Sequence, residues 1–255
     1  MILAKKDPDE SLDQHTQNCL SVLSDFIQRF DYYPIVADRQ NLFELLFRAV
    51  LFHDFGKAAS GFQDYLHGNN DNGHYRHEIL STLFLPELPV SDEDKTFILL
   101  AIATHHKDIV NLKEKTGLSG GRHNGFKVFK EKAEQLKLNL TKLEPVFDSL
   151  KIQQSKLTNS EYRINNLPAI PDDYNPVYDD INRYRIKAED GLLSQQEIIT
   201  GVFMRGILVT CDHLASGGKK KLPPPIPRAN QIIIKKDFNL YKFQKQAAKT
   251  SGHLS

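Results

Sequence analysis

The sequence lacks several features that would assign it to a specialised class of protein. Its two cysteines, Cys19 and Cys211, are too few for the disulfide framework of a secreted scaffold. No apolar run approaches the roughly 20 residues of a membrane span, and the first residues lack the long apolar core of a secretion signal. The formal net charge is only +1 at pH 7, so binding to a polyanion would need a local basic patch or bound metal cations. We therefore expect a cytoplasmic protein with reduced thiols and no membrane contact.

Length and composition are those of an ordinary globular protein. The 255 residues are enough for one large or two modest domains, and 40% of them are hydrophobic and 25% charged. Apolar residues at helical spacing predict helices over residues 10–30 and 39–54, around 61–67, from 76 to the prolines at 86 and 89, from 91 to about 105, over 125–157, and from 194 to about 214. Ser91 with Asp94, and Ser194 with Glu197, resemble capping boxes. The prediction is an all-α fold as far as residue 216.

Three stretches depart from this helical pattern. The helix over 125–157 is expected to be peripheral and broken at Pro145, and residues 158–193 gather Asn, Pro, Asp and Tyr, which predicts an irregular insertion or mobile loop. Residues 217–230 hold a lysine run and three consecutive prolines and predict a linker. Residues 231–255 then begin a second unit, with a short strand at 232–234 and the start of a helix at 241.

The most informative stretch is His53-Asp54-Phe55-Gly56-Lys57, which follows an apolar run over residues 42–52. That run is apolar on nearly every side, which predicts a buried helix, and Gly56 is a candidate helix stop. An ionised carboxylate at the end of a buried helix must be paired, hydrogen-bonded or metal-bound. The His-Asp pair is therefore a candidate site.

Further imidazoles and carboxylates lie in or at the ends of the other apolar helices. The full set of candidate metal ligands is His15, His53, Asp54, His77, His105, His106 and Asp212. Mixed imidazole and carboxylate ligands suit Mn, Fe, Co, Ni or Zn better than an all-oxygen magnesium site. Seven donors exceed what one open catalytic ion needs, but they suit two ions that share a bridging carboxylate and cleave a phosphoester.

Each of these residues also has an ordinary structural interpretation. A single histidine such as His15 is usually packed or on the surface, and an adjacent His-Asp pair is common by chance. His105 and His106 diverge by roughly 100° on a helix, so they can serve one site only where the helix ends or frays. Asp212 could simply cap a helix or pair with a basic side chain. The order and setting of the whole set favour a metal site over these alternatives.

The ordered set resembles the HD metal-dependent phosphohydrolase superfamily and, more narrowly, the HD nuclease domain of the helicase-nuclease of type I CRISPR interference (the Cas-three family). The resemblance covers about residues 10–216. It depends on His15, the HDFGK run at 53–57, His77 in the run at 76–81, the pair His105-His106, and Asp212 in the run at 210–216. It implies an HD-domain helical bundle with a metal site at its centre.

The resemblance also implies roles for individual residues. His15, His53, Asp54 and Asp212 would hold one divalent ion, and His77, His105 and His106 would hold a second, with Asp54 bridging. Mn, Fe, Co or Ni would be favoured and Mg allowed. Asp54 and Lys57 would be catalytic, with Lys57 attracting the scissile phosphate, although a surface lysine is an equal alternative. Ser216 would make a hydrogen bond behind the metal ligands. The activity would be endonucleolytic cleavage of single-stranded DNA, with exonuclease trimming.

The last residues extend the resemblance. Phe243-Gln244, with Gln246-Ala247, resembles the glutamine motif of superfamily 2 helicases, and the chain stops before any phosphate-binding Gly-Lys-Thr/Ser loop. The resemblance implies that residues 1–216 are the HD nuclease domain, 217–230 a linker, and 231–255 the start of a truncated helicase. The expected partners are single-stranded DNA, the helicase domain of the same full-length chain, and the CRISPR RNA-guided surveillance complex.

Several alternatives stay open at this stage. The second enzymatic candidate is an HD-superfamily nucleotide or cyclic-nucleotide phosphohydrolase, and a non-enzymatic candidate is an HD module that binds metal structurally. His74 is a reserve ligand because it precedes His77 by three residues. Cys19 follows His15 by four and could share its helix face as a soft ligand, but packing in the core is the favoured interpretation.

Overall fold

The computed structural model describes residues 1–29, 39–69, 76–106, 122–157 and 163–223. The chain divides into two compact units, Met1–Leu222 and Pro223–Ser255, and the described residues lie almost wholly in the first. The strand predicted at 232–234 and the helix predicted from 241 fall outside the described residues. The domain boundaries at 216 and 230 therefore stay predictions.

Among the described residues the first unit is helical, which confirms the all-α class. Its α-helices are α1 (Leu12–Arg29), α2 (Arg39–Phe52), α3 (Ser60–Leu66), α4 (His77–Ser81), α5 (Asp92–Thr104), α7 (Arg122–Lys137), α8 (Leu140–Leu157), α9 (Asn175–Glu189) and α10 (Gln195–Ser216). Two short 3-10 helices, η1 (Phe55–Ala58) and η2 (Thr82–Phe84), join them. The sequence did not predict the small antiparallel pair of β1 (Leu3–Lys5) and β2 (Glu10–Ser11).

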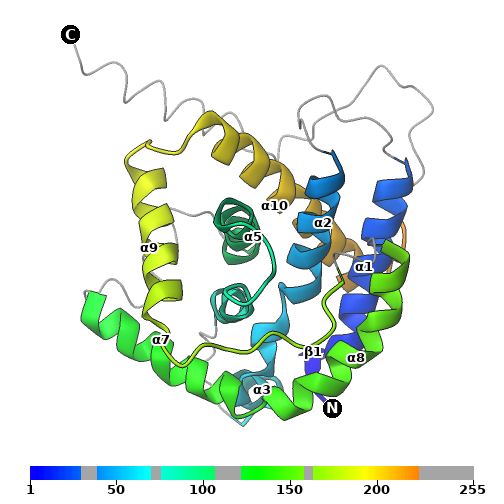
Figure 1. Cartoon of the computed structure of the whole chain (residues 1–255). Helices are drawn as coiled ribbons and strands as arrows, with labels where there is room; N and C mark the ends of the chain where they lie inside the picture. The colour runs from blue at the N-terminus through cyan, green and yellow to red at the C-terminus, as the bar shows by residue number, and fades with distance from the viewer. Residues whose placement is uncertain (30–38, 70–75, 107–121, 158–162, 224–255) are drawn as a thin grey trace. The chain divides into compact units, whose positions relative to one another are not determined.

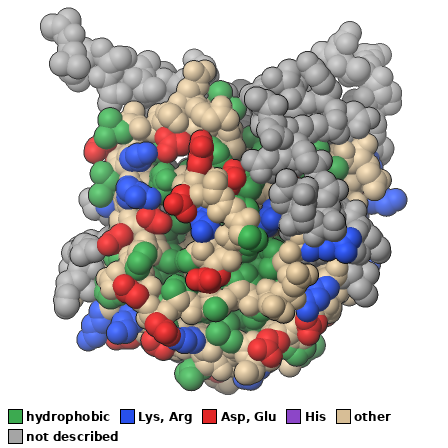
Figure 2. Space-filling model, in the orientation of Figure 1, with side chains coloured by type: hydrophobic (Ala, Val, Ile, Leu, Met, Phe, Trp, Pro, Cys, Tyr) green, Lys and Arg blue, Asp and Glu red, His purple; other side chains and the backbone are tan. Residues whose placement is uncertain are grey.

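Helix α5 lies in the middle of the first unit, with α10, α2, α7 and α9 around it (Figure 1). It contacts α10, α2, α4 and α9, and every residue from Thr96 to Thr104 is buried. A helix that is apolar on all sides is stable only when neighbours cover each side, which is why α5 is central. On the face shown in Figure 2, lysine and arginine side chains are interspersed with aspartate and glutamate. The described part of that face therefore has no extended patch of positive or of negative charge alone.

Helix α2 and the turn after it position the predicted His-Asp pair. The side chains from Leu42 to Phe52 are buried, as the apolar run predicted. The helix ends at Phe52, earlier than the predicted residue 54, so Gly56 is not its stop and the chain continues into η1. Gly56 is needed instead for a close approach, because a Cβ there would lie 2.0 Å from the carbonyl oxygen of His77 in α4. Its N–H also donates to Ser81 Oγ at 2.8 Å.

Two other boundaries differ from the sequence prediction. The region 125–157 is broken between α7 and α8 at Leu138–Asn139 rather than at Pro145, which lies inside α8. Asn139 supplies a reason for that break, because its side-chain amide donates to the buried carbonyl oxygen of Ala58 at 2.8 Å. The helix from residue 76 is also shorter than predicted, since α4 ends at Ser81 and gives way to η2.

The prediction of an irregular stretch over 158–193 was wrong for its second half, which forms α9. Val177, Tyr178, Ile181 and Tyr184 are buried on one face of this helix at helical spacing. Pro176 is compatible with it because it sits in the first turn, where a backbone N–H has no intrahelical partner. The prediction of a loop rests on composition and on an apparent loss of periodicity over 158–193, whereas the buried face of α9 does repeat at helical spacing.

Helix α10 begins with the predicted capping box, in which Ser194 and Glu197 satisfy each other's backbone N–H groups. It packs against α5, α1 and α2, and its last turns carry Asp212. By length and composition α10 could cross a membrane, a test that a buried core helix also passes, and no other described helix meets it. The expectation that the protein contacts no membrane stays untested.

Candidate metal centre

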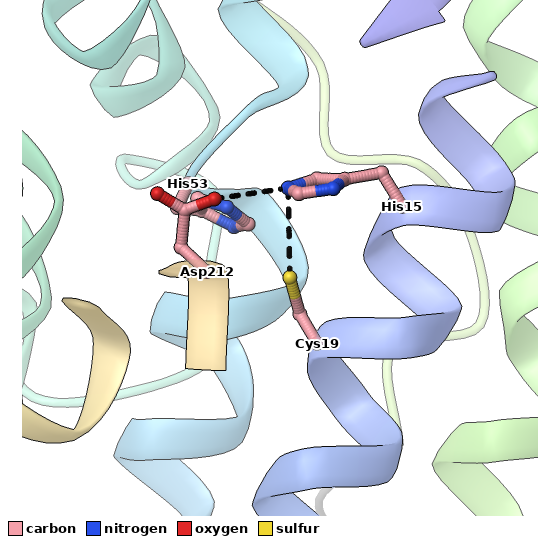
Figure 3. A group of neighbouring side chains, drawn as sticks. All are labelled: His15, Cys19, His53 and Asp212. Atoms are coloured by element: carbon pink, nitrogen blue, oxygen red, sulfur yellow. Dashed lines mark hydrogen bonds and ion pairs between the residues drawn. The ribbon is translucent and has the colours of Figure 1, made fainter. Parts of the chain in front are cut away.

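The seven predicted ligands, which are widely spaced in the sequence, come together in the middle of the first unit as two groups. The first cluster is His15, Cys19, His53 and Asp212, and the second cluster is Asp54, His77, His105 and His106. Within each group the possible ligand atoms all lie within 4.8 Å of one another. Helices α1 and α10 and the end of α2 supply the first cluster (Figure 3). The start of α4, the end of α5 and the turn after α2 supply the second.

The backbone around two of the histidines fixes which ring nitrogen faces the centre. Nδ1 of His53 lies 2.8 Å from the carbonyl oxygen of Val50, and Nδ1 of His105 lies 2.7 Å from that of Ile102. A carbonyl oxygen only accepts, so Nδ1 carries the hydrogen in both rings and donates it. In the neutral imidazole Nε2 then keeps its lone pair, which is the arrangement of a metal-binding histidine.

His105 and His106 both reach the second cluster because the helix ends immediately before them. Helix α5 stops at Thr104, His105 caps it, and the two ring centroids lie only 3.9 Å apart. Neighbouring side chains inside a helix diverge by roughly 100°, so His105 and His106 can face the same site only because the helix ends here. His106 is the exposed member of the cluster, so the centre reaches solvent at this end of α5.

Asp54 lies between the two clusters and turns one carboxylate oxygen towards each. Its Oδ1 lies 3.1 Å from His77 Nε2 and 4.0 Å from His105 Nε2. Its Oδ2 lies 3.3 Å from His15 Nε2 and 3.5 Å from His53 Nε2. Asp54 is thus the one carboxylate among the described residues of the centre with a separate set of imidazoles at each oxygen.

The hydrogen bonding of the centre is incomplete in a way that a cation would correct. Among the described residues, the Nε2 atoms of His53 and His105 are buried without a hydrogen bond, and the two oxygens of Asp54 have ion-pair contacts but no hydrogen bond of good geometry. An unsatisfied buried polar group costs roughly 1–3 kcal/mol. Two buried ring nitrogens without a partner beside a buried carboxylate fit a site built to hold metal ions.

The spacing of the donor atoms also fits shared coordination. Two nitrogen ligands about 2.0–2.1 Å from one tetrahedral ion lie about 3.3 Å apart. In the second cluster Nε2 of His77 lies 3.1 Å from Nε2 of His106. In the first cluster Nε2 of His15 lies 3.1 Å from Oδ1 of Asp212. These separations are those of atoms that can bind one ion together.

Without metal, the charges of the first cluster compensate one another. Burial alone would lower the pKa of His15, but hydrogen bonds to Asp212 and Asp54 raise that pKa to about 12. Burial likewise opposes the charged form of His53, and the negative charge of Asp54 raises its pKa to about 9. Burial would raise the pKa of Asp212, but the hydrogen bond from His15 lowers it. The two histidines are therefore imidazolium ions that occupy the place of a cation.

The second cluster has the opposite character. Burial lowers the pKa of His77 to about 4, with the charge of Asp54 opposing the shift only in part. Burial also lowers the pKa values of His105 and His106. These imidazoles are neutral at neutral pH and can bind a metal without first losing protons.

The other predicted members of the centre are also accounted for. Lys57 is 9% exposed and its Nζ lies 2.6 Å from Asp54 Oδ2, so it is a buried partner of Asp54 and not a surface lysine. Together with His53, Lys57 lowers the pKa of Asp54 against the effect of burial. The hydroxyl of Ser216 donates to Asp212 Oδ1 at 3.3 Å, which confirms the hydrogen bond predicted behind the ligands. His74, the reserve ligand, lies outside the described residues.

Sequence reasoning missed two contributors. Glu10 Oε2 lies 3.3 Å from His15 Nδ1, and Glu10 Oε1 accepts from the side-chain amide of Asn18 at 3.0 Å. A carboxylate behind a metal-binding imidazole orients the ring and fixes its tautomer. Cys19 was weighed as a soft ligand but expected to pack in the core; it is a buried core residue, and its Sγ also lies 3.6 Å from His15 Nε2. The four-residue spacing to His15 was the available signal for Cys19, whereas none marked Glu10.

The described residues of the centre thus form buried His, Asp and Cys groups that could hold metal ions. Comparison with protein-family models, with curated proteins and with solved structures finds no match to this chain.

Proposed function

We propose that the chain is a metal-dependent phosphodiester hydrolase of the HD type, and that it acts as a nuclease on single-stranded DNA. The observation that supports this most strongly is the position of Asp54, whose two oxygens face separate sets of imidazoles. A carboxylate shared in this way is what two adjacent divalent ions require of a bridging ligand. One ion would be held by His15, His53, Asp54 and Asp212, and the other by Asp54, His77, His105 and His106.

Bound divalent ions would supply Lewis acidity, which activates water as a nucleophile and neutralises charge developing on a phosphodiester. The chain's own residues prepare the site for this. The Nδ1 hydrogens of His53 and His105 are committed to backbone carbonyls, so both rings are held with Nε2 inward. Lys57 supplies a buried positive charge beside Asp54, where it can pair with an anionic substrate oxygen. His106, the exposed ligand, marks the side from which a substrate would approach.

The choice of DNA as substrate comes from the resemblance of the ordered motifs to the Cas-three HD nucleases. The proposed partners follow from it: single-stranded DNA, a helicase domain in the full-length chain, and an RNA-guided surveillance complex, all in the cytoplasm.

The test compares metal content with activity in the same preparations. The chain is stripped with EDTA, reloaded with Mn, Co, Ni or Mg, and assayed on single-stranded DNA and on a panel of nucleotides and cyclic nucleotides. Asp54→Asn keeps the shape of the bridging side chain but removes its charge. Asp148→Asn on α8 is the matched control, because that carboxylate is 63% exposed and pairs only with Lys151 among the described residues.

The expected result is binding of two equivalents of a transition metal and metal-dependent DNA cleavage by the wild type and Asp148→Asn. Asp54→Asn should lose cleavage by at least about 100-fold, the scale of removing one electrostatic group from a catalytic site. Nucleotide hydrolysis without DNA cleavage would favour the second candidate, an HD nucleotide phosphohydrolase. Two tightly bound metals with no hydrolysis of any substrate would leave only a structural role for the centre.

A further inference from the structure

We propose that Cys19 is a metal ligand, so that the two ion positions differ in kind: the first contains a thiolate and the second does not. The inference rests on the proposed metal centre but names a ligand that the predicted set of seven does not contain. Cys19 lies one helical turn after His15 on α1, and residues four apart share one face of a helix. Its side chain is fully buried, and its sulfur points towards the same place as the His15 ring and the Asp212 carboxylate (Figure 3).

The position of the sulfur has the dimensions of a coordination site. In a tetrahedral site with a metal–sulfur distance of about 2.3 Å and a metal–nitrogen distance of about 2.05 Å, sulfur and nitrogen lie about 3.6 Å apart. The observed separation between Cys19 Sγ and His15 Nε2 is 3.6 Å. The sulfur is also within 4.8 Å of the ligand atoms of His53 and Asp212.

A simple thiol hydrogen bond does not account for the surroundings of His15 Nε2. That single nitrogen has three neighbours at close range: Cys19 Sγ at 3.6 Å, Asp212 Oδ1 at 3.1 Å and Asp54 Oδ2 at 3.3 Å. An imidazole nitrogen carries at most one hydrogen, so it cannot donate a well-directed bond to all three. A cation in their midst would interact favourably with every one of them.

An independent observation also points to a ligand in this place. His53 is 0% exposed, and its Nε2 has no hydrogen-bond partner among the described residues. Its Nδ1 is already committed to the Val50 carbonyl, so Nε2 is directed into the space that it shares with Cys19. A buried ring nitrogen left without a partner next to a thiol, a carboxylate and a second imidazole is the donor set of a metal site.

The second cysteine shows that burial alone does not bring a thiol to the centre. Cys211 is 1% exposed and immediately precedes Asp212, yet its sulfur belongs to neither cluster. Cys211 is therefore the matched control for Cys19, since both are buried and both lie on helices that form the first cluster.

The ligand sets imply that the two positions take different metals. With two imidazoles, the Asp212 carboxylate, one oxygen of the bridging Asp54 and one thiolate, the first position favours Zn, Co or Fe, because thiolate is a soft ligand that Mg and Mn bind poorly. The second cluster has three imidazoles and the bridging carboxylate, which suits Mn, Fe, Co or Ni.

Cobalt spectroscopy on the whole chain tests the proposal without depending on activity. Metal-free wild type, Cys19→Ser and Cys211→Ser are titrated with Co²⁺, and two signals are followed. Visible ligand-field bands report any bound Co²⁺, whereas the near-ultraviolet charge-transfer band appears only when a thiolate is bound. The wild type and Cys211→Ser should show both signals, and Cys19→Ser should keep the ligand-field bands but lose the charge-transfer band. The affinity of Cys19→Ser for Zn²⁺ should fall by at least tenfold.

The outcomes separate this inference from the proposed function. Ligand-field bands without a charge-transfer band in the wild type would reject Cys19 as a ligand and leave the two-metal centre intact. A charge-transfer band that persists in Cys19→Ser would also reject it. Absence of both signals in the wild type would reject the metal centre and this inference together. If Cys19→Ser fails to fold, X-ray absorption of the Zn-loaded wild type decides, because a sulfur neighbour at about 2.3 Å must be present.

Discussion

The metal-free protein should be most stable near pH 6.5 and should lose stability in both directions from there. The reason is that the pKa values of the clustered histidines move in opposite directions. His77 has a lowered pKa, so its neutral folded form is penalised as pH falls and the unfolded chain takes up the proton first. His53 and His15 have raised pKa values, so their stabilisation is present below about 6.5 and is lost as pH rises towards the folded-state values.

The size of each limb follows from the pKa values. Between the ordinary histidine pKa of 6.5 and the value of about 4 for His77, at about 1.4 kcal/mol per pH unit, the loss on the acid side is about 3 kcal/mol. The same arithmetic from 6.5 to about 9 gives about 3 kcal/mol for His53 on the alkaline side, and His15 adds to it in the same direction. For a unit of about 220 residues, 3 kcal/mol corresponds to a change in Tm of about 6–12 °C.

The assay is thermal unfolding followed by circular dichroism in EDTA, between about pH 4 and about pH 9, for the wild type and two variants. His77→Gln should reduce the acid limb, to which His105 and His106 also contribute, and should leave the alkaline limb unchanged. Asp212→Asn should weaken the alkaline limb by removing the first acceptor that raises the pKa of His15. Saturating Mn²⁺ should raise Tm, and the gain should grow from pH 6.5 towards pH 9, because metal binds the neutral imidazoles. A metal-free Tm that stays constant across this range, or that rises steadily with pH, would refute the assignment of charges.

Three further outcomes are expected. Gly56→Ala should destabilise the fold by roughly 1–3 kcal/mol and weaken metal binding at the second cluster, because the added Cβ would lie 2.0 Å from a backbone oxygen. Gly201→Ala is the control, because its Cβ would lie 3.7 Å from the nearest atom, and it should be neutral or slightly stabilising. Chemical denaturation measures both. Glu10→Gln should lower Zn²⁺ affinity at the first cluster roughly tenfold with little change at the second, as measured by calorimetry; equal losses at both would contradict an orienting role. Lys57→Met should tighten Mn²⁺ binding roughly tenfold, because it removes the ammonium that competes for Asp54 Oδ2, and it should slow DNA cleavage; unchanged affinity would show that the ion pair does not compete with metal.

The sequence was sufficient to predict that these donors lie together because most of them lie at the ends of strongly apolar helices. A carboxylate such as Asp54 after a buried helix needs compensation wherever the helix packs. The order of the remaining histidines resembled that of the HD superfamily, and the described structure brings all seven predicted donors together in two groups. Their role as ligands stays a prediction that the metal titrations test.

The features that could not be predicted from the sequence are contacts that depend on how the helices and strands pack together. Periodicity showed that Cys19 shares a face with His15, but not how far that face reaches into the centre. Glu10 acts from a two-residue strand too short to leave a pattern. The break at Asn139 is explained by a hydrogen bond to Ala58, 81 positions away in the chain, so no local signal reported it. Helix α9 was missed for a different reason, because the helical spacing of Val177, Ile181 and Tyr184 was not recognised in a stretch rich in Asn, Pro, Asp and Tyr.

The contact between His15 and Asp212 joins residues 197 positions apart. A nascent chain therefore carries its first imidazole long before the ribosome has made the carboxylate that meets it. The first 106 residues contain His15, His53 and the pair His105-His106. The first cluster is complete only after α10, which carries Asp212, has emerged and docked against α1. Until that moment the growing polypeptide lacks one donor of the first cluster, so the proposed metal centre can form only when synthesis of the first unit is almost over.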